Sequence, residues 1–369
     1  MYFLKLGTIG FGGPVALVGY MHRDLVEQKK WIAEEDYREG MALSQLAPGP
    51  LAAQLAIYIG YVHYRVLGAT LAGLAFVLPS FIMVLGIGMA YVYYEGLSLV
   101  QSIFYGVGAA VIGIIAISAY RLTKKSIGNN YYLWFIYLVT AAVTIITETE
   151  NIWLFIGAGI FYMLVKYAGM KKKSNVAATF LFPVLLQINP GIADTDKLTN
   201  IFVFFAKAGA FVFGSGLAIV PFLYSGVVKE YGWLNETQFM DAVAVAMITP
   251  GPVVITVGFI GYVSAGFSGA CVAAFATFFP CYVLTVLPAP YFKKYGKRTS
   301  IKAFVDGITA AAVGAIAGAV IVLGKRNIYD LPTIAICVAT ILILFYTKKL
   351  PEPFIILLAA IIGVLIKVL

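Results

Sequence analysis

The stretch "LSQLAPGPLAAQL", residues 43–55, places Pro48-Gly49-Pro50 inside a run that is otherwise apolar enough to enter a membrane. Proline lacks a backbone N–H and clashes with the preceding helical turn, while glycine permits unusual dihedral angles. One half-helix is therefore predicted to end here and another to begin. Unwound backbone at membrane depth is tolerated only against protein or a water-filled cavity, so this break points to a buried, functional position.

The whole chain has the composition of an integral membrane protein. Of its 369 residues, 61% are hydrophobic and 12% are charged, and the mean hydropathy is +0.92. Apolar runs such as 66–92, 100–120 and 270–287 reach or approach the ~20 residues that a helix needs to cross the hydrocarbon layer. Short loops join these runs, which argues against a soluble catalytic domain. The first apolar stretch lacks a cleavage site and is expected to be retained.

Several other classes of protein fit this composition poorly. The net charge of +9 is spread over loop ends rather than gathered on one face, which argues against nucleic-acid binding. Cys271, Cys281 and Cys337 lie in apolar runs without metal-ligand spacing and are expected to be core thiols. With only His22 and His63, a histidine metal site or a catalytic triad has little to build on. We expect no metal, no cofactor and no catalytic residue.

The break occurs twice. The segment "ITPGPVVITVGFIGY" at 248–262 matches "LAPGPLAAQLAIYIGY" at 46–61. A shift of 202 residues, then of 201 after one residue of slip, pairs equivalent positions along the chain: Lys5 with Lys207, Gly12 with Gly214, Pro48-Gly49-Pro50 with Pro250-Gly251-Pro252, Pro79 with Pro280, and Lys124 with Lys325. The predicted divisions are an N-terminal repeat (1–170), a linker with a short apolar segment (171–198) and a C-terminal repeat (199–369). Such a duplication is the signature of a transporter built from two structural repeats.

The basic residues predict the orientation of the two halves. Each half shows six hydrophobic elements, and a further apolar stretch at 176–188 lies between them. If that stretch crosses, the halves are inverted. A thirteen-span scheme with the N-terminus inside gives fifteen basic residues inside and seven outside, as the positive-inside rule requires. This scheme puts the loop at 23–38 and Lys325 and Arg326 outside, with Arg65, Lys229 and Lys124 inside. The predicted fold is an all-α polytopic membrane protein of about 12–13 membrane segments, with two inverted repeats and broken or re-entrant helices.

Two further segments predict breaks of the same kind. "GFGGPVALVGY" at 10–20 and its counterpart "VFGSGLAIVPF" at 212–222 carry glycines that would leave backbone N–H groups bare at the start of a second half-helix. Four breaks, two in each repeat, can aim positive helix ends at one point in the middle of the membrane. That arrangement is typical of an anion site.

These segments together resemble a known family. "FLKLGTIGFGGPVALVGY", "KKWIAEEDYREGMALSQLAPGPLAAQLAIYIGY" and "GATLAGLAFVLPS" are similar to the chromate ion transporter family, and the second half carries the matching "FGSG" and "TPGP" segments. The resemblance covers nearly the whole chain. It implies a two-repeat prokaryotic transporter that exports chromate, with sulfate as a related oxyanion, and confers chromate resistance. Members of the family often carry His at the position of Leu17 and Cys at that of Ser44, so neither residue is assigned a proton or thiol role.

Residue candidates for the anion site follow from the breaks and from the repeat. Lys5 and Lys207 can neutralise a dianion, or they can extend to an interface as charged side chains at membrane edges do. Polar side chains beside the breaks can donate hydrogen bonds to oxyanion oxygens, or they can join helices. Glu39 and Asp241 can carry coupling protons, or they can be solvated residues near a helix start. The predicted substrate-binding residues are Lys5, Gly12, Gly13, Pro14, Ser44, Gln45, Pro48, Gly49, Pro50, Gln54, Lys207, Gly214, Ser215, Gly216, Thr249, Pro250, Gly251, Pro252 and Thr256.

The function expected from these features is secondary transport that exports chromate across the cytoplasmic membrane, driven by the membrane potential, by proton antiport or by both. The partners expected are chromate, sulfate as a second substrate, the lipid bilayer and a second copy in a homodimer. A channel or a carrier for another anion such as sulfate is the main alternative. A membrane-embedded enzyme would need the acidic cluster of the first loop, and the second repeat keeps few of those acids.

Overall fold

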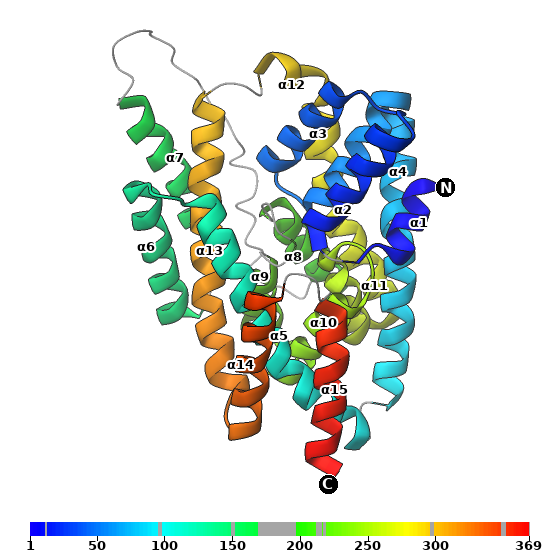
Figure 1. Cartoon of the computed structure of the whole chain (residues 1–369), viewed down its shortest axis with the longest axis vertical. Coiled ribbons are helices and arrows are strands. Elements are labelled where there is room, and N and C mark those ends of the chain that lie inside the picture. The colour runs from blue at the N-terminus through cyan, green and yellow to red at the C-terminus, as the bar shows by residue number, and fades with distance from the viewer. Residues whose placement is uncertain are drawn as a thin grey trace.

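The computed structural model describes residues 1–11, 13–94, 98–148, 152–168, 197–211, 216, 219–295, 299–347 and 352–368. These residues form helices and connections without a strand (Figure 1). The first repeat contains α1 (Tyr2–Ile9), α2 (Gly13–Met21), η1 (His22–Gln28), α3 (Glu34–Leu46), α4 (Leu51–Tyr94), α5 (Ser98–Ser126), α6 (Tyr131–Thr147) and α7 (Ile152–Ala168). The second contains α8 (Lys197–Phe211), α9 (Ile219–Tyr224), η4 (Ser225–Glu230), α10 (Glu236–Ile248), η5 (Val253–Ile255), α11 (Thr256–Val286), α12 (Ala289–Tyr295), α13 (Thr299–Asn327), α14 (Leu331–Tyr346) and α15 (Glu352–Val368). Gly12, Gly214, Ser215 and the stretch 176–188 lie outside the described residues.

The long elements α4 and α11 are each two helices joined by a sharp reversal. The backbone leaves the helical region at Tyr64 and Arg65 in α4, and at Ala265 and Gly266 in α11. In α4 the two arms pack so closely that a Cβ on Gly60 would overlap the carbonyl of Gly68. Each element therefore contributes a half-helix of the break and a separate crossing helix.

The half-helices beside the first Pro-Gly-Pro fold back on each other. Gly40 of α3 packs against the ring of Tyr58 in the first arm of α4, which leaves no room for a side chain there. The Nε2 atom of His63 lies 2.9 Å from the carbonyl oxygen of Trp31, so the two outer ends of the segment meet. This segment enters from one face of the protein and returns to the same face. It is a re-entrant hairpin with Pro48-Gly49-Pro50 at its tip.

The first broken segment has the same form. The Tyr2 hydroxyl donates to Asp24 over 3.1 Å, and the Lys29 ammonium lies 5.2 Å from the centre of the Tyr2 ring. The beginning of α1 thus meets the end of η1, although a break at 10–12 separates the two helices. In the second repeat, Phe204 of α8 meets Trp233, which follows η4, with 5.7 Å between ring centres. Both repeats therefore begin with a hairpin that returns to its own face.

The last three helices of the two repeats are interlocked. Helix α13 packs against α6 and α7 of the first repeat, and α5 packs against α14 and α15 of the second (Figure 1). Glycines permit the contacts at equivalent positions: Gly106 lies against the carbonyl of Ala359, and Gly307 against that of Ala158. Because each repeat fills the other's helix grooves, the two halves form one continuous structure.

The equivalent helices α5 and α13 run in opposite directions. Ile127, just after α5, belongs to the same buried cluster as Ala303 near the start of α13. At the other end, Tyr105 near the start of α5 donates to Asp330, just after α13, over 2.5 Å. Each helix has 29 residues, or roughly 43 Å, which exceeds the ~30 Å hydrocarbon layer. The two repeats are inverted with respect to each other.

The re-entrant hairpins show that part of the predicted distribution of charge is wrong. The thirteen-span scheme put the loop at 23–38 and Arg65 on opposite sides, but the contact between Trp31 and His63 puts them on one face. It also separated Lys229 from Arg326, yet both pair with Glu148. The scheme counted each re-entrant hairpin as a crossing, because an apolar hairpin and a crossing helix have the same hydropathy.

With the hairpins in place, the basic residues divide more sharply. One face carries Arg23, Lys29, Lys30, Arg38, Arg65, Arg121, Lys124, Lys125, Lys166 and Lys302 at the ends of its elements, and the other carries Lys197, Lys229, Lys325, Arg326 and Lys367. The positive-inside rule assigns the first face to the cytoplasm. By length and apolarity, four described helices qualify as crossing helices: 51–94, 101–126, 253–292 and 299–327. Shorter apolar helices accompany them, and the total number of segments stays a prediction.

The arrangement predicts which positions a membrane-impermeant thiol reagent can reach. In a variant with Cys271→Ser, we expect Glu35→Cys and Lys124→Cys to be labelled from the cytoplasmic side and Lys325→Cys only from the opposite side. All three native side chains are exposed. Cys281 and Cys337 are buried, so labelling of the parent protein that contains only these two cysteines measures the background. Labelling of Glu35→Cys and Lys124→Cys from different sides would contradict the hairpin, and labelling of Lys124→Cys and Lys325→Cys from one side would contradict the inversion.

Candidate functional site: the meeting point of the helix breaks

The tip of the second repeat's Pro-Gly-Pro hairpin lies against the first repeat. The N–H of Gly251 donates to the carbonyl of Gly10 over 2.9 Å, which joins the break at 250–252 to the break at 10–12. Gly251 has φ of +100°, and a Cβ there would overlap Ser80 Oγ. The Ser80 hydroxyl itself donates to the carbonyl of Gly7 over 3.3 Å. This glycine satisfies both a backbone conformation and a close approach that no other residue fits well.

The first repeat's tip makes the equivalent contact. Gly49 has φ of +142°, and a Cβ there would lie 2.8 Å from both Cys281 Sγ and the Gln54 side chain. Ser80 and Cys281 are equivalent residues, each directly after the proline inside a crossing helix. Ser80 is the middle residue of the arm 66–94. Each tip therefore reaches the mid-depth of the other repeat's crossing helix.

A third break joins the group within the second repeat. Gly216, the one described residue of the segment 212–218, is buried, and a Cβ there would lie 3.3 Å from the side chain of Val253. Gly13 has φ of +71° and open space at its Cβ position, and Pro14 follows it at the start of α2. A direct contact thus joins Gly10 to the tip at 250–252, and Gly216 lies beside Val253, which follows that tip. The break at 48–50 adjoins Cys281 on the opposite crossing helix.

The polar side chains at the two Pro-Gly-Pro breaks differ in what they bind. Thr249 and Thr256 each donate to a carbonyl of their own helical segment over 2.7 Å, so their protons are already engaged. The Gln54 amide donates to the carbonyls of Ala47 and Pro48 at 3.3 and 2.8 Å, but its Oε1 atom has no hydrogen-bond partner. The Ser44 hydroxyl likewise has none, and both side chains have no exposed surface. Gln45, also predicted to bind substrate, is exposed and lies apart from this group.

The predicted charged residues take unequal positions in the two halves. Lys5 on α1 is exposed, whereas Lys207 on α8 is half-buried. Among the described residues, no contact joins these two lysines. Asp241 is 4% exposed and accepts a hydrogen bond of 2.7 Å from Tyr91 of the other repeat. Glu39 is half-exposed and interacts with the Tyr58 hydroxyl. Asp241 is therefore a buried residue rather than a solvated one.

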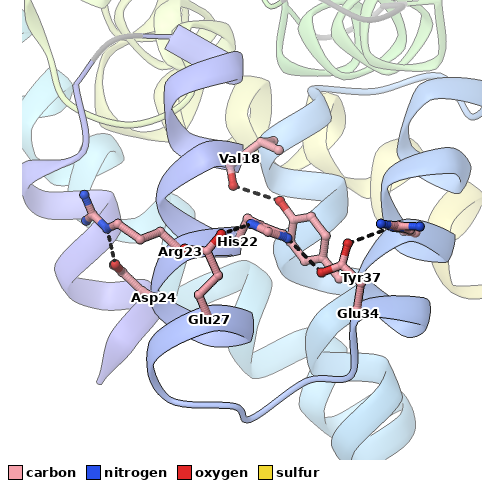
Figure 2. A network of polar contacts seen from close by, with 8 residues as sticks. Val18, His22, Arg23, Asp24, Glu27, Glu34 and Tyr37 are labelled. Atoms are coloured by element: carbon pink, nitrogen blue, oxygen red, sulfur yellow. Dashed lines mark hydrogen bonds and ion pairs between the residues drawn. The ribbon is translucent and has the colours of Figure 1, made fainter.

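A charge network on the cytoplasmic face stays within the first repeat. Figure 2 shows the His22 ring between Glu27, at 3.1 Å, and Glu34, at 2.9 Å. Arg38 also pairs with Glu34, over 2.7 Å. The hydrogen bonds from His22 and then Arg38 hold the pKa of Glu34 below its ordinary value. The Tyr37 hydroxyl donates to the carbonyl of Val18 over 2.8 Å, and together these contacts fasten α3 to α2 and η1.

The equivalent acid in the second repeat is held differently. Glu236 corresponds to Glu34, but its partner is Arg326 at the end of α13. Arg326 also binds Glu148 at the end of α6, and Lys229 approaches the same carboxylate at 3.2 Å. This network ties the second repeat's hairpins to the interlocked helices of both repeats. Any movement of these hairpins along α13 has to break it.

The polar groups at the breaks are enclosed. Ser44, Gln54 and Thr256 are fully buried, and Thr249 is 6% exposed. A cavity of about 350 Å³ lies between α6 and α7 and is lined by apolar side chains such as Phe135, Trp153 and Phe161. It contains no residue of the breaks.

The sequence pointed to the glycines and prolines of the breaks but missed the residues that they contact. Ser80 and Cys281 carried one available signal, since each follows a proline that the duplication aligns. Tyr91 carried none, because its partner Asp241 lies 150 residues away. In the part of the chain that the structure describes, no cluster of three or more His, Cys, Asp or Glu could hold a metal ion.

Inverted repeats with broken helices that meet at mid-depth are typical of membrane transport proteins, many secondary transporters among them. The chain belongs to the chromate transporter family, whose model matches residues 1–163 and 199–364. It is 67% identical to the chromate transport protein of Cupriavidus metallidurans over 98% of this chain and 91% of that protein. It is 61% identical to the probable chromate transport protein of Synechococcus elongatus over 99% of this chain and 94% of that protein.

A shorter relative and the solved structures complete the comparison. An uncharacterized transporter of Bacillus subtilis, YwrB, is 26% identical over 44% of this chain and 85% of its own length. Its length is thus close to that of one repeat. No solved structure matches this chain significantly.

The two tip glycines predict a shared effect of substitution. Gly49→Ala or Gly251→Ala should reduce transport at least about tenfold, because strain at positive φ costs roughly 1–3 kcal/mol and the methyl group displaces Cys281 or Ser80. Gly86→Ala is the matched control, since it lies in the same crossing helix as Ser80 with nothing near its Cβ position. Flux should be compared at equal amounts of folded protein in the membrane. Unchanged flux in both tip variants would mean that the breaks only bend the helices and have no role in transport.

Proposed function

We propose that this protein is a carrier that exports chromate across the cytoplasmic membrane and thereby confers chromate resistance. The observation that carries the proposal is near-full-length identity of 67% and 61% to proteins named for chromate transport. The position of the helix breaks supports it independently, since broken helices at mid-depth are where secondary transporters bind substrate.

The energetics favour export. An anion that leaves a cell with a negative interior gains about 2.3 kcal/mol per elementary charge per 100 mV, which is roughly 2.3 for a monoanion and 4.6 for a dianion. Import would need coupled cations or protons to overcome the same potential. The described core holds Asp241 as a buried carboxylate, and its hydrogen bond with Tyr91 joins the second repeat to the first repeat's crossing helix. Asp241 is therefore a candidate group for coupling to protons, and the membrane potential can act without it.

A sulfate carrier and an anion channel are the competing functions. The enclosure of Ser44, Gln54 and Thr256 supports a carrier, because a channel needs a continuous wet path in its open state. The cytoplasmic excess of basic residues supports capture of an anion from the inside, because a positive surface raises the local concentration of anions.

Flux in proteoliposomes tests the proposal. Purified protein should move chromate out of the compartment that its cytoplasmic face contacts. A membrane potential that makes this compartment negative should accelerate the movement when no pH gradient is present. A pH gradient imposed at zero potential measures proton coupling, and Asp241→Asn should abolish only that component. Vesicles without protein are the control. Sulfate flux without chromate flux would overturn the proposed substrate, and ion currents far above carrier rates would indicate a channel.

A further inference from the structure

Two buried polar atoms at the first break have no hydrogen-bond partner. They are Gln54 Oε1 and Ser44 Oγ, and both side chains have no exposed surface. They flank the same break, and the Gln54 amide lies against Gly49, whose Cβ position is 2.8 Å from the amide nitrogen. Leaving a buried acceptor without a donor costs about 1–3 kcal/mol, so such an atom needs a donor from a ligand or a water molecule.

The surroundings of Gln54 determine which end of the amide is unoccupied. The carbonyl oxygens of Ala47 and Pro48, at 3.3 and 2.8 Å, can only accept, so the NH2 group must face them. The remaining atom is the carbonyl oxygen, which can only accept. The sequence suggested that Gln54 donates to an oxyanion. The structure instead offers an acceptor, which repels an oxyanion oxygen unless that oxygen carries a proton.

Acceptors distinguish oxyanions by their protonation. Hydrogen chromate forms near neutral pH, as do the hydrogen phosphates, whereas hydrogen sulfate forms only in strong acid. An acceptor inside an anion site therefore favours an ion that still carries an O–H group. The Ser44 hydroxyl can donate to an unprotonated oxygen, which a hydrogen oxyanion also has.

We propose that Gln54 is a specificity residue that accepts a hydrogen bond from the O–H group of a hydrogen oxyanion and so selects hydrogen chromate against sulfate. The proposal rests on the proposed function. Only the first repeat carries this acceptor. The second repeat has Thr256 and Ala246 at the positions equivalent to Gln54 and Ser44, and the Thr256 proton is engaged with the carbonyl of Val253.

Other titratable groups near Gln54 have to be separated from the substrate's own titration. From α3, Glu39 and Asp36 approach Tyr58, which follows Gln54 by one turn of α4. From α11, the Cys281 thiol also lies at Gly49, 2.8 Å from the same Cβ position as the Gln54 amide. Asp36→Asn therefore serves as the control for any change with pH, and Gly86→Ala, with nothing near its Cβ position, serves as the neutral control in the crossing helix.

The test measures chromate and sulfate flux in proteoliposomes on the acid and alkaline sides of neutrality. Unaltered protein should transport chromate faster on the acid side at equal total chromate, and sulfate should compete poorly. Gln54→Leu should lower the preference for chromate over sulfate about tenfold and flatten the pH dependence, and Ser44→Ala should weaken chromate binding. The two control variants, Asp36→Asn and Gly86→Ala, should keep both properties of the unaltered protein.

The outcomes distinguish this proposal from the proposed function. If unaltered protein moves no chromate, the proposed function is wrong. If chromate moves and folded Gln54→Leu keeps the pH dependence and the preference, Gln54 Oε1 binds only water and the inference is wrong. Should Gln54→Leu fail to fold, competition between inorganic phosphate and chromate for transport by the unaltered protein tests the inference instead. Phosphate should compete with chromate better than sulfate does, and equal competition would overturn the inference.

Discussion

The structure depends on one constraint, which is that unwound backbone inside a membrane must be covered by protein. Each Pro-Gly-Pro tip meets this requirement by packing against the other repeat. Gly251 lies against Ser80 and Gly10, and Gly49 lies against Cys281. Gln54 also covers Gly49 from within the first repeat, but the crossing helix that packs against each tip belongs to the other repeat, which favours inverted and interlocked repeats.

Repeat symmetry applies to the backbone more strictly than to the side chains. The kinks at Arg65 and Gly266, the prolines inside the crossing helices and the glycine contacts of α5 and α13 all occur in equivalent pairs. The charge networks do not, because His22 serves Glu34 where Arg326 serves Glu236. The polar groups at the tips also differ, with an open acceptor in one repeat and an engaged hydroxyl in the other. A symmetric scaffold therefore carries an asymmetric site.

The sequence predicted the helical fold, the duplication and the breaks because these depend on local chemistry. Proline and glycine interrupt a helix wherever they occur, and a shift of 202 residues is visible without any coordinates. The sequence could not show that the broken segments are re-entrant hairpins, because hydropathy carries no signal for the contact between Trp31 and His63. Nor could it separate Ser44 from Gln45. These neighbours differ only in the helix face that they occupy, and one is buried while the other is exposed.

The most direct test of the central claim is a disulfide between the first tip and the second repeat's crossing helix. With Gly49→Cys, the new Cβ would lie 2.8 Å from the native Cys281 Sγ, a separation suited to a disulfide. Mild oxidation in the membrane should link the two residues, as peptide mapping by mass spectrometry would show. Gly251→Cys is the matched control, because its neighbour at the equivalent position is Ser80 and no link to that position can form. If Gly49→Cys stays unlinked to Cys281 in folded protein, the tips do not meet the opposite repeat and this account of the fold is wrong.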